Sequence, residues 1–229
     1  MKLIVGTQEE VIKKAAQRYV KLLNEKPEAV LGLATGSTPL GLYAELVKLC
    51  AEGKISFAKC TTFNLDEYIG LDGTHDQSYR YFMNKNLFEK VDIRMEATHV
   101  PSGAVKSDEE AEQYDAEIKA AGGIDLQLLG IGNNGHIGFN EPLTPFTSMT
   151  HIVKLTDSTR EANKRFFASI DDVPTHAVTM GIHTVMQAKS IILMAFGEGK
   201  AEIAVPASLL QLHEDVELYL DEAAASKLS

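Results

Sequence analysis

Short apolar runs alternate with longer amphipathic segments along almost the whole chain. Residues 30–34 form a continuous apolar run, which is typical of a strand covered on both sides. Residues 8–24 repeat apolar side chains every three or four positions, as an amphipathic helix does. Strands separated by helices pair in parallel. The pattern therefore predicts an α/β fold with an open, mostly parallel sheet and helices on both faces, a Rossmann-like three-layer sandwich.

The element boundaries follow from the same periodicity and from capping residues. We expect strands at residues 2–5, 30–34, 60–65, 98–100, 124–129, 150–155, 190–196 and 216–220. We expect longer helices at residues 7–24, 39–49, 78–88, 107–121 and 156–167. Thr7 and Glu10 form a capping box at the start of the first helix. No repeat or linker interrupts the pattern, which predicts a single domain over residues 1–229.

Composition excludes several classes of function. The chain has 229 residues, 45% of them hydrophobic, but no apolar run approaches the roughly 18 residues of a membrane span. A net charge of −10 without a basic cluster argues against nucleic-acid binding. The N-terminus resembles no targeting signal, so we expect a cytoplasmic protein. Neither the histidines nor Cys50 and Cys60 have metal-ligand spacing, so we expect no metal and reduced thiols.

Ligands of open α/β sheets bind beyond the carboxyl ends of the strands, so the loops after the strands are the candidate sites. The first such loop, in LATGSTPLGLY, contains Thr35, Gly36, Ser37 and Thr38 before Pro39. Hydroxyls, backbone N–H groups and a helix N-terminus suit an anion. The alternative is an ordinary capped turn between a strand and a helix.

The second loop, in FNLDEYIGLDGTHDQSY, places Asp66 and Glu67 at the end of a predicted strand. A carboxylate at the rim of the sheet can act as a general base when it lies within hydrogen-bond reach of an acidic C–H. The alternative is a pair of solvated acids on the surface. The residues alone leave both interpretations open.

The third loop, LLGIGNNGHIGFNEP, contains a G-x-G-x-x-G pattern at Gly130, Gly132 and Gly135. That pattern is the dinucleotide fingerprint only where a helix opens at the third glycine. Gly138 and Pro142 follow within a few residues, and no amphipathic period continues the segment. The sequence therefore argues against a dinucleotide site.

The same loop also carries a polar cluster of Asn134, His136, Asn140 and Glu141. A carboxylate that accepts from one imidazole nitrogen sets the tautomer and raises the basicity of the other nitrogen. Such a pair suits proton transfer near neutral pH. The alternative is an inert loop histidine.

Two cations could complete an anion pocket. Arg160 lies at the start of a predicted helix in LTDSTREANKRF, and Lys200 follows a glycine turn in AFGEGKA. Taken singly, each could equally be an ordinary surface cation.

Taken together, these strings resemble the glucosamine-6-phosphate deaminase family. The resemblance rests on LATGSTPLGLY, FNLDEYIGL, GIGNNGHIGFNEP, STR, TMGI and PASLLQLH, and it covers about residues 30–225. It implies conversion of glucosamine 6-phosphate and water to fructose 6-phosphate and ammonium, without a cofactor. The related 6-phosphogluconolactonases share the fold but lack the FNEP continuation after the GH pair.

The resemblance also implies roles for individual residues. Asp66 matches the base that removes the proton from carbon two, and His136 matches the residue that opens the sugar ring. Asn134 and Glu141 match the groups beside it. The phosphate-binding positions match Thr35, Gly36, Ser37, Thr38, Arg160 and Lys200. An aspartate that serves as this base is expected to have a pKa raised by burial.

The chain departs from the family pattern in three places. Asn134 stands where some members have an aspartate, so this position can orient or bind but cannot relay charge. The stretch SMTHIVKL has His151 and Val153 instead of the two cations of an allosteric site, which predicts a short form without allosteric activation. The connection between Lys200 and the PAS motif is only five residues long.

The leading hypothesis is therefore an amino-sugar phosphate deaminase that acts on a small-molecule sugar phosphate. One alternative is a 6-phosphogluconolactonase-like hydrolase. The non-enzyme alternative is a sugar-phosphate sensor, which would need a helix-turn-helix that this chain has no room for. We expect a monomer, with a homo-oligomer as the alternative, and no nucleic-acid or membrane partner.

Overall fold

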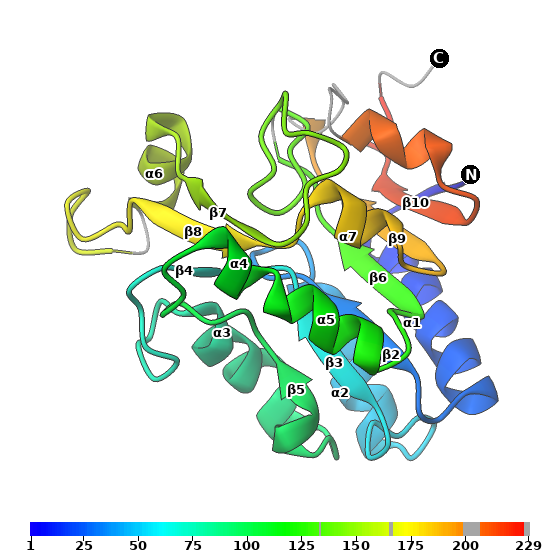
Figure 1. Cartoon of the computed structure of the whole chain (residues 1–229). Coiled ribbons are helices and arrows are strands. Elements are labelled where there is room, and N and C mark those ends of the chain that lie inside the picture. Colours follow the sequence, from blue (N-terminus) through cyan, green and yellow to red (C-terminus); the bar gives the residue numbers. More distant parts are fainter. Residues whose placement is uncertain (133, 165–166, 199–206, 227–229) are drawn as a thin grey trace.

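The fold is built on a central parallel sheet (Figure 1). The computed structural model describes residues 1–132, 134–164, 167–198 and 207–226. Within these residues a seven-stranded sheet has the order β1-β10-β9-β6-β2-β3-β5, and every neighbouring pair is parallel. Its strands are β1 (Lys2–Gly6), β2 (Val30–Leu33), β3 (Thr61–Asn64), β5 (Thr98–His99), β6 (Leu126–Leu129), β9 (Ile191–Ala195) and β10 (Val216–Asp221). The predicted open parallel sheet is confirmed.

Helices cover both faces of this sheet, as predicted (Figure 1). They are α1 (Gln8–Glu25), α2 (Leu40–Ala51), α3 (Tyr79–Asn86), α4 (Asp108–Ala111), α5 (Gln113–Ala120), α6 (Asp157–Asn163) and α7 (Ile182–Met186). Short 3-10 turns cover Phe88–Lys90, Met95–Ala97 and Ala207–Leu212. Thr7 and Glu10 form the expected capping box of α1. The predicted helix over residues 107–121 is divided into α4 and α5, and α6 ends earlier than expected, at Asn163.

The strand order creates a topological switch point at β2. From β2 the chain moves outward to β3 and β5, then returns to β6 on the other side of β2 and continues to β9 and β10. The loops after β2 and β6 therefore leave the sheet side by side in opposite directions, which is where ligands of open α/β sheets bind. These are the first and third candidate loops of the sequence.

A second sheet, which the sequence did not predict, has the order β4-β8-β7 and is antiparallel. It contains β4 (Asp66–Tyr68), β7 (His151–Lys154) and β8 (His176–Thr179). The strand expected at residues 150–155 exists as β7, but it belongs to this sheet and not to the parallel one. Hydrophobic periodicity can predict a strand, but it does not indicate which other strand it pairs with. β4 is too short to show any periodicity.

The apolar core follows this division into two sheets. One large buried cluster packs the parallel sheet against its helices, and a smaller one contains Tyr68, Phe139, Leu155 and Ala177 beside the antiparallel sheet. None of the helices in the described ranges is both long and apolar enough to cross a membrane.

Candidate active site

The three candidate loops meet at one cavity of about 780 Å³. Its walls include residues 34–38 after β2, Asp66 at the start of β4, and part of the loop after β6. The first turn of α6 and the aromatic residues Tyr68, Tyr79, Phe139 and Phe167 line it as well. Segments separated by up to about 130 residues in the sequence therefore share a single site.

The loop after β2 contributes the part of the wall that suits an anion. Thr35, Gly36, Ser37 and Thr38 all line the cavity, immediately before α2. The first turn of a helix presents backbone N–H groups that its own carbonyls do not use, and the helix dipole favours negative charge there. Gly36 has φ +96°, a left-handed conformation that a side chain would strain. The four residues expected to bind an anion thus lie together at the cavity, and anion binding by them stays a prediction.

The start of this loop is held in place from α2. The Tyr43 hydroxyl donates to the Ala34 carbonyl over 2.6 Å and accepts from the Ala34 N–H over 3.2 Å. Both groups are buried. Because Ala34 at the end of β2 is fixed to α2, residues 35–39 between them have a defined path.

Asp66 is the first residue of β4 and lies opposite Thr179 of β8. Only 6% of its surface is exposed, at the cavity wall. Burial disfavours the carboxylate and, with the negative charge of Glu67 next to it, raises the pKa of Asp66 to about 8. A carboxylate with this pKa is a much stronger base than an ordinary aspartate, and it is half ionised near pH 8.

Glu67 has a structural role. Its carboxylate accepts hydrogen bonds from the backbone N–H groups of Tyr68, Tyr79 and Arg80, over 2.8, 3.0 and 3.0 Å. Tyr79 and Arg80 are the first two residues of α3, so Glu67 fastens the start of that helix to β4. Of the two acids that the sequence offered at this turn, Asp66 faces the cavity and Glu67 holds the turn in place.

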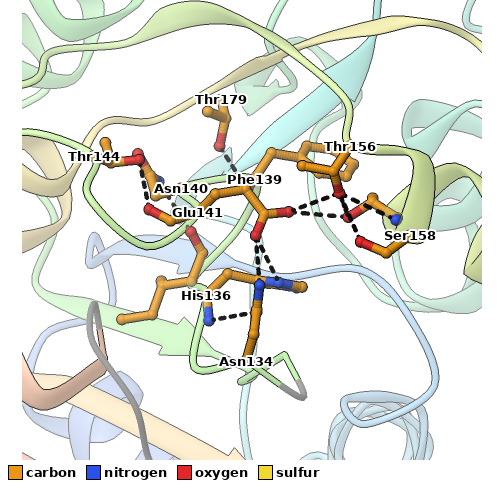
Figure 2. Close-up of polar contacts among 11 residues, drawn as sticks. Asn134, His136, Phe139, Asn140, Glu141, Thr144, Thr156, Ser158 and Thr179 are labelled. Atoms are coloured by element: carbon orange, nitrogen blue, oxygen red, sulfur yellow. Dashed lines mark hydrogen bonds and ion pairs between the residues drawn. The ribbon is translucent and has the colours of Figure 1, made fainter.

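The loop after β6 brings His136, Asn134 and Glu141 together (Figure 2). The Asn134 Nδ2 donates to Glu141 Oε2 over 2.6 Å, and its Oδ1 accepts from the His136 backbone N–H over 3.3 Å. The same Glu141 oxygen lies 3.9 Å from His136 Nδ1. The carboxylate therefore faces one ring nitrogen of the imidazole.

Two glycines of this loop leave room for functional side chains. A Cβ on Gly132 would lie 2.2 Å from Cε1 and Nε2 of His136, so the imidazole packs directly on the glycine. A Cβ on Gly138 would lie 3.2 Å from Asp66 Oδ2, and Gly138 has φ +59°. Gly132, the second glycine of the pattern that imitates a dinucleotide fingerprint, thus makes room for the His136 ring.

Asn140 fixes the end of the loop. It is fully buried, and its Nδ2 donates to the carbonyls of Ile137 and Met180, over 2.9 and 2.7 Å. Met180 directly follows β8, so the loop is fastened to the antiparallel sheet. The sequence predicted Asn140 only as one member of a polar cluster. Its position in the FNEP run was the one feature that could have indicated its structural role.

Of the two expected phosphate-binding cations, Arg160 is not among the residues that line the cavity. The Arg160 guanidinium donates to the carbonyls of Ile170 and Val173, over 2.8 and 3.2 Å, and so closes the loop that follows α6. Lys200 lies outside the described residues. A phosphate-binding role for either residue stays a prediction.

Sequence reasoning also missed the hydroxyls of Ser158 and Thr159. Both line the cavity from the first turn of α6. The STR string was interpreted through Arg160, whereas the two hydroxyl residues of the string, Ser158 and Thr159, are the ones that face the site. No group of three or more His, Cys, Asp or Glu side chains among the described residues is arranged to hold a metal ion.

Comparison with known proteins identifies the family. The family model described as glucosamine-6-phosphate isomerases/6-phosphogluconolactonase matches residues 6–215. The chain belongs to this family. Among curated relatives, glucosamine-6-phosphate deaminase of Clostridium perfringens (strain 13 / Type A) is 52% identical over the full length of both chains. The deaminase of Thermoanaerobacter pseudethanolicus is 50% identical over 99% of this chain and 94% of its own.

Two solved structures resemble this chain to different degrees. A monomeric glucosamine-6-phosphate deaminase superposes with a TM-score of 0.94 at 44% identity, over 99% of this chain and 100% of its own. The 6-phosphogluconolactonase of Trypanosoma brucei has a TM-score of 0.76 at 18% identity, over 100% of this chain and 98% of its own. The second likeness shows a shared fold and no more.

Proposed function

We propose that this protein is a glucosamine-6-phosphate deaminase, which converts glucosamine 6-phosphate and water to fructose 6-phosphate and ammonium. The observation that carries the proposal is a buried carboxylate, Asp66, with a pKa of about 8, which lines the same cavity as His136, the imidazole that Glu141 faces. The deaminase relatives, at about 50% identity, support it over the lactonases, which resemble this chain at about 20%.

The phosphate of the substrate binds at the loop of Thr35, Gly36, Ser37 and Thr38. A phosphate dianion suits a helix N-terminus whose backbone N–H groups point at it. Binding at this end of the cavity is remote from the reacting carbons, so its free energy can hold the sugar in register for the reaction.

His136 opens the sugar ring. The cyclic amino sugar has no acidic C–H, so a proton must first move from the anomeric hydroxyl to the ring oxygen. Glu141 faces Nδ1 of the imidazole, which favours a proton there and leaves Nε2 as the base. Asn134 orients Glu141 through its amide and cannot itself exchange a proton in this step.

Asp66 then removes the proton from carbon two of the open-chain aldehyde. The adjacent carbonyl makes this C–H acidic, and the product of deprotonation is an enolamine. Protonation at carbon one gives an imine at carbon two, and water releases ammonium and leaves the ketone of fructose 6-phosphate. The raised pKa of Asp66 brings it close to the operating pH, where a general base is most effective.

We place the enzyme in the cytoplasm as a monomer with no required cofactor, and the likeness to a monomeric deaminase supports the monomer. Light scattering on the purified protein measures the oligomeric state directly, and a mass of twice 25.0 kDa would contradict this part of the proposal.

The first prediction concerns turnover. Purified protein with glucosamine 6-phosphate should release ammonium and fructose 6-phosphate in equal amounts, measured by two coupled assays. Asp66→Asn, which removes the base but keeps the shape, should lower kcat about 10²–10⁴-fold. The exposed Asp72→Asn in the same segment is the matched control and should turn over normally.

Two results would contradict the proposal. Near-normal ammonium release by Asp66→Asn would remove Asp66 as the base. Hydrolysis of 6-phosphogluconolactone with no ammonium from glucosamine 6-phosphate would favour the lactonase alternative instead.

A further inference from the structure

The two oxygens of the Glu141 carboxylate bind different elements (Figure 2). Oε2 accepts from Asn134 and faces His136, both in the loop after β6. Oε1 accepts from the Thr159 hydroxyl over 3.0 Å, and the Thr156 hydroxyl lies 3.4 Å away. Glu141 therefore connects the histidine loop to the first turn of α6.

Thr159 is the stronger of the two α6 contacts. Thr156 is the N-cap of α6, and its hydroxyl accepts from the Thr159 N–H over 3.2 Å. The Thr156 hydroxyl also donates to the Thr159 hydroxyl over 2.9 Å. Because a hydroxyl has one proton, this leaves Thr159 as the donor to Glu141. The resulting chain of hydrogen bonds runs from the cap of α6 through Thr159 to the carboxylate.

The same turn of α6 faces the cavity. Ser158 and Thr159 line it, as do Asn163 and Phe167 further along. A ligand in the cavity therefore contacts the segment that holds one oxygen of Glu141, while the other oxygen faces the imidazole. The position of α6 and the orientation of His136 are linked through a single carboxylate.

We infer that Thr159 is a positioning residue for ring opening: its hydroxyl holds Glu141 in the rotamer that faces His136 Nδ1. This rests on the proposed deaminase function. A carboxylate held by donors on both oxygens has one orientation, whereas a carboxylate held on one oxygen can rotate about its terminal bond. Loss of the Thr159 hydroxyl thus loosens the imidazole without removing any group from the reaction itself.

The experiment compares three variants of the full chain. Thr159→Val keeps the shape and the β-branch of threonine but removes the hydroxyl, and Thr159→Ser restores it. Thr175→Val is the matched control, because the Thr175 hydroxyl is exposed and contacts His176 at the start of β8. Each variant is assayed for kcat and KM with cyclic glucosamine 6-phosphate.

Thr159→Val should lower kcat about 10-fold, since small displacements of a catalytic group cost this much or more. Affinity for the open-chain alditol of the substrate, measured by calorimetry, should change by less than about 2-fold, because this ligand needs no ring opening. Thr159→Ser and Thr175→Val should keep the kcat of the unaltered protein. Unchanged kcat in Thr159→Val, or a loss that serine does not restore, overturns the inference.

A second measurement needs no turnover. The ring signals of His136 in a spectrum of ¹⁵N-histidine-labelled protein should move in Thr159→Val and return in Thr159→Ser. Unmoved signals contradict the positioning role. If the unaltered protein releases no ammonium, the proposed function fails, and these spectra still decide whether Thr159 orients His136.

Discussion

Asp66 illustrates at the scale of one residue how a catalytic requirement opposes stability. Its pKa is about 8 in the folded chain, against an ordinary value of 3.8. A folded-state pKa above the unfolded one means that the folded protein holds this proton more tightly. The contribution of protonated Asp66 to the stability of the fold is therefore complete below about pH 4, declines as pH rises, and is lost above about pH 8.

Replacement of Asp66 by Asn should therefore raise thermal stability at high pH and change it little at pH 4. We expect a gain of a few degrees in Tm at pH 9, since 1 kcal/mol moves Tm by about 2–4 °C in a domain of this size. Calorimetric scans from pH 4 to pH 9 measure it. An equal gain at both ends of the range would show that the buried charge is not the cause.

At the scale of an element, the loop after β6 depends on its glycines for the placement of side chains. Gly132 packs against the His136 ring, Gly135 has φ +81°, and Gly138 lies beside Asp66. Gly132 is not one of the glycines with a positive φ. It is needed here because it leaves space for the His136 ring, and not because of its backbone conformation. A substitution there tests the ring position without straining the backbone.

Gly132→Ala should displace the imidazole, because the new methyl group would lie 2.2 Å from two ring atoms. We expect kcat to fall about 10²-fold, as for a catalytic group moved by about 1 Å, while the circular dichroism spectrum stays unchanged. Gly130→Ala is the comparison, because its methyl group would meet nothing within 4 Å. Equal losses of kcat in the two variants would rule out the steric explanation.

At the scale of the whole molecule, Asp125 joins segments that are far apart in the sequence. Its carboxylate accepts from Lys26 at the end of α1 over 2.9 Å, from the Val30 N–H at the start of β2 over 2.8 Å, and from Lys189 before β9 over 2.7 Å. Burial alone would raise the pKa of Asp125, but the hydrogen bonds from Lys189, Lys26 and Val30 outweigh it and lower the pKa.

Asp125→Ala should lower the free energy of unfolding by about 2–3 kcal/mol, because it removes charge-assisted hydrogen bonds and leaves a buried N–H without its acceptor. The pKa of Asp125 is lower in the folded protein than in the unfolded one. Its carboxylate therefore stabilises the fold at pH values above the ordinary value near 4, and this contribution is lost as pH falls. Urea titrations should therefore show a smaller difference in the free energy of unfolding between Asp125→Ala and the unaltered protein at pH 3 than at pH 7. Asp171→Asn, at an exposed aspartate, is the control and should be neutral at both.

Much of the architecture could be predicted from local pattern. The parallel sheet, the helices on both faces and the loops that would form the site all follow from apolar periodicity and from the rule that ligands bind at strand ends. The antiparallel sheet could not, because β4 is three residues long and its partner β8 lies 108 residues further along the chain. Pairing between distant short strands leaves no periodic signal.

The local pattern of residues shows which side chains are available: the strand-end acids, the histidine loop with its glycines and the hydroxyls before α2. How these side chains are used depends on the packing of segments that lie far apart in the chain. Packing turned Asp66 toward the cavity and Glu67 toward α3, directed Arg160 to backbone carbonyls, and placed Thr159 against Glu141. The reason is that periodicity encodes which residues are buried, whereas the neighbours of a buried group, and hence its pKa and its bonds, come from segments distant in the chain.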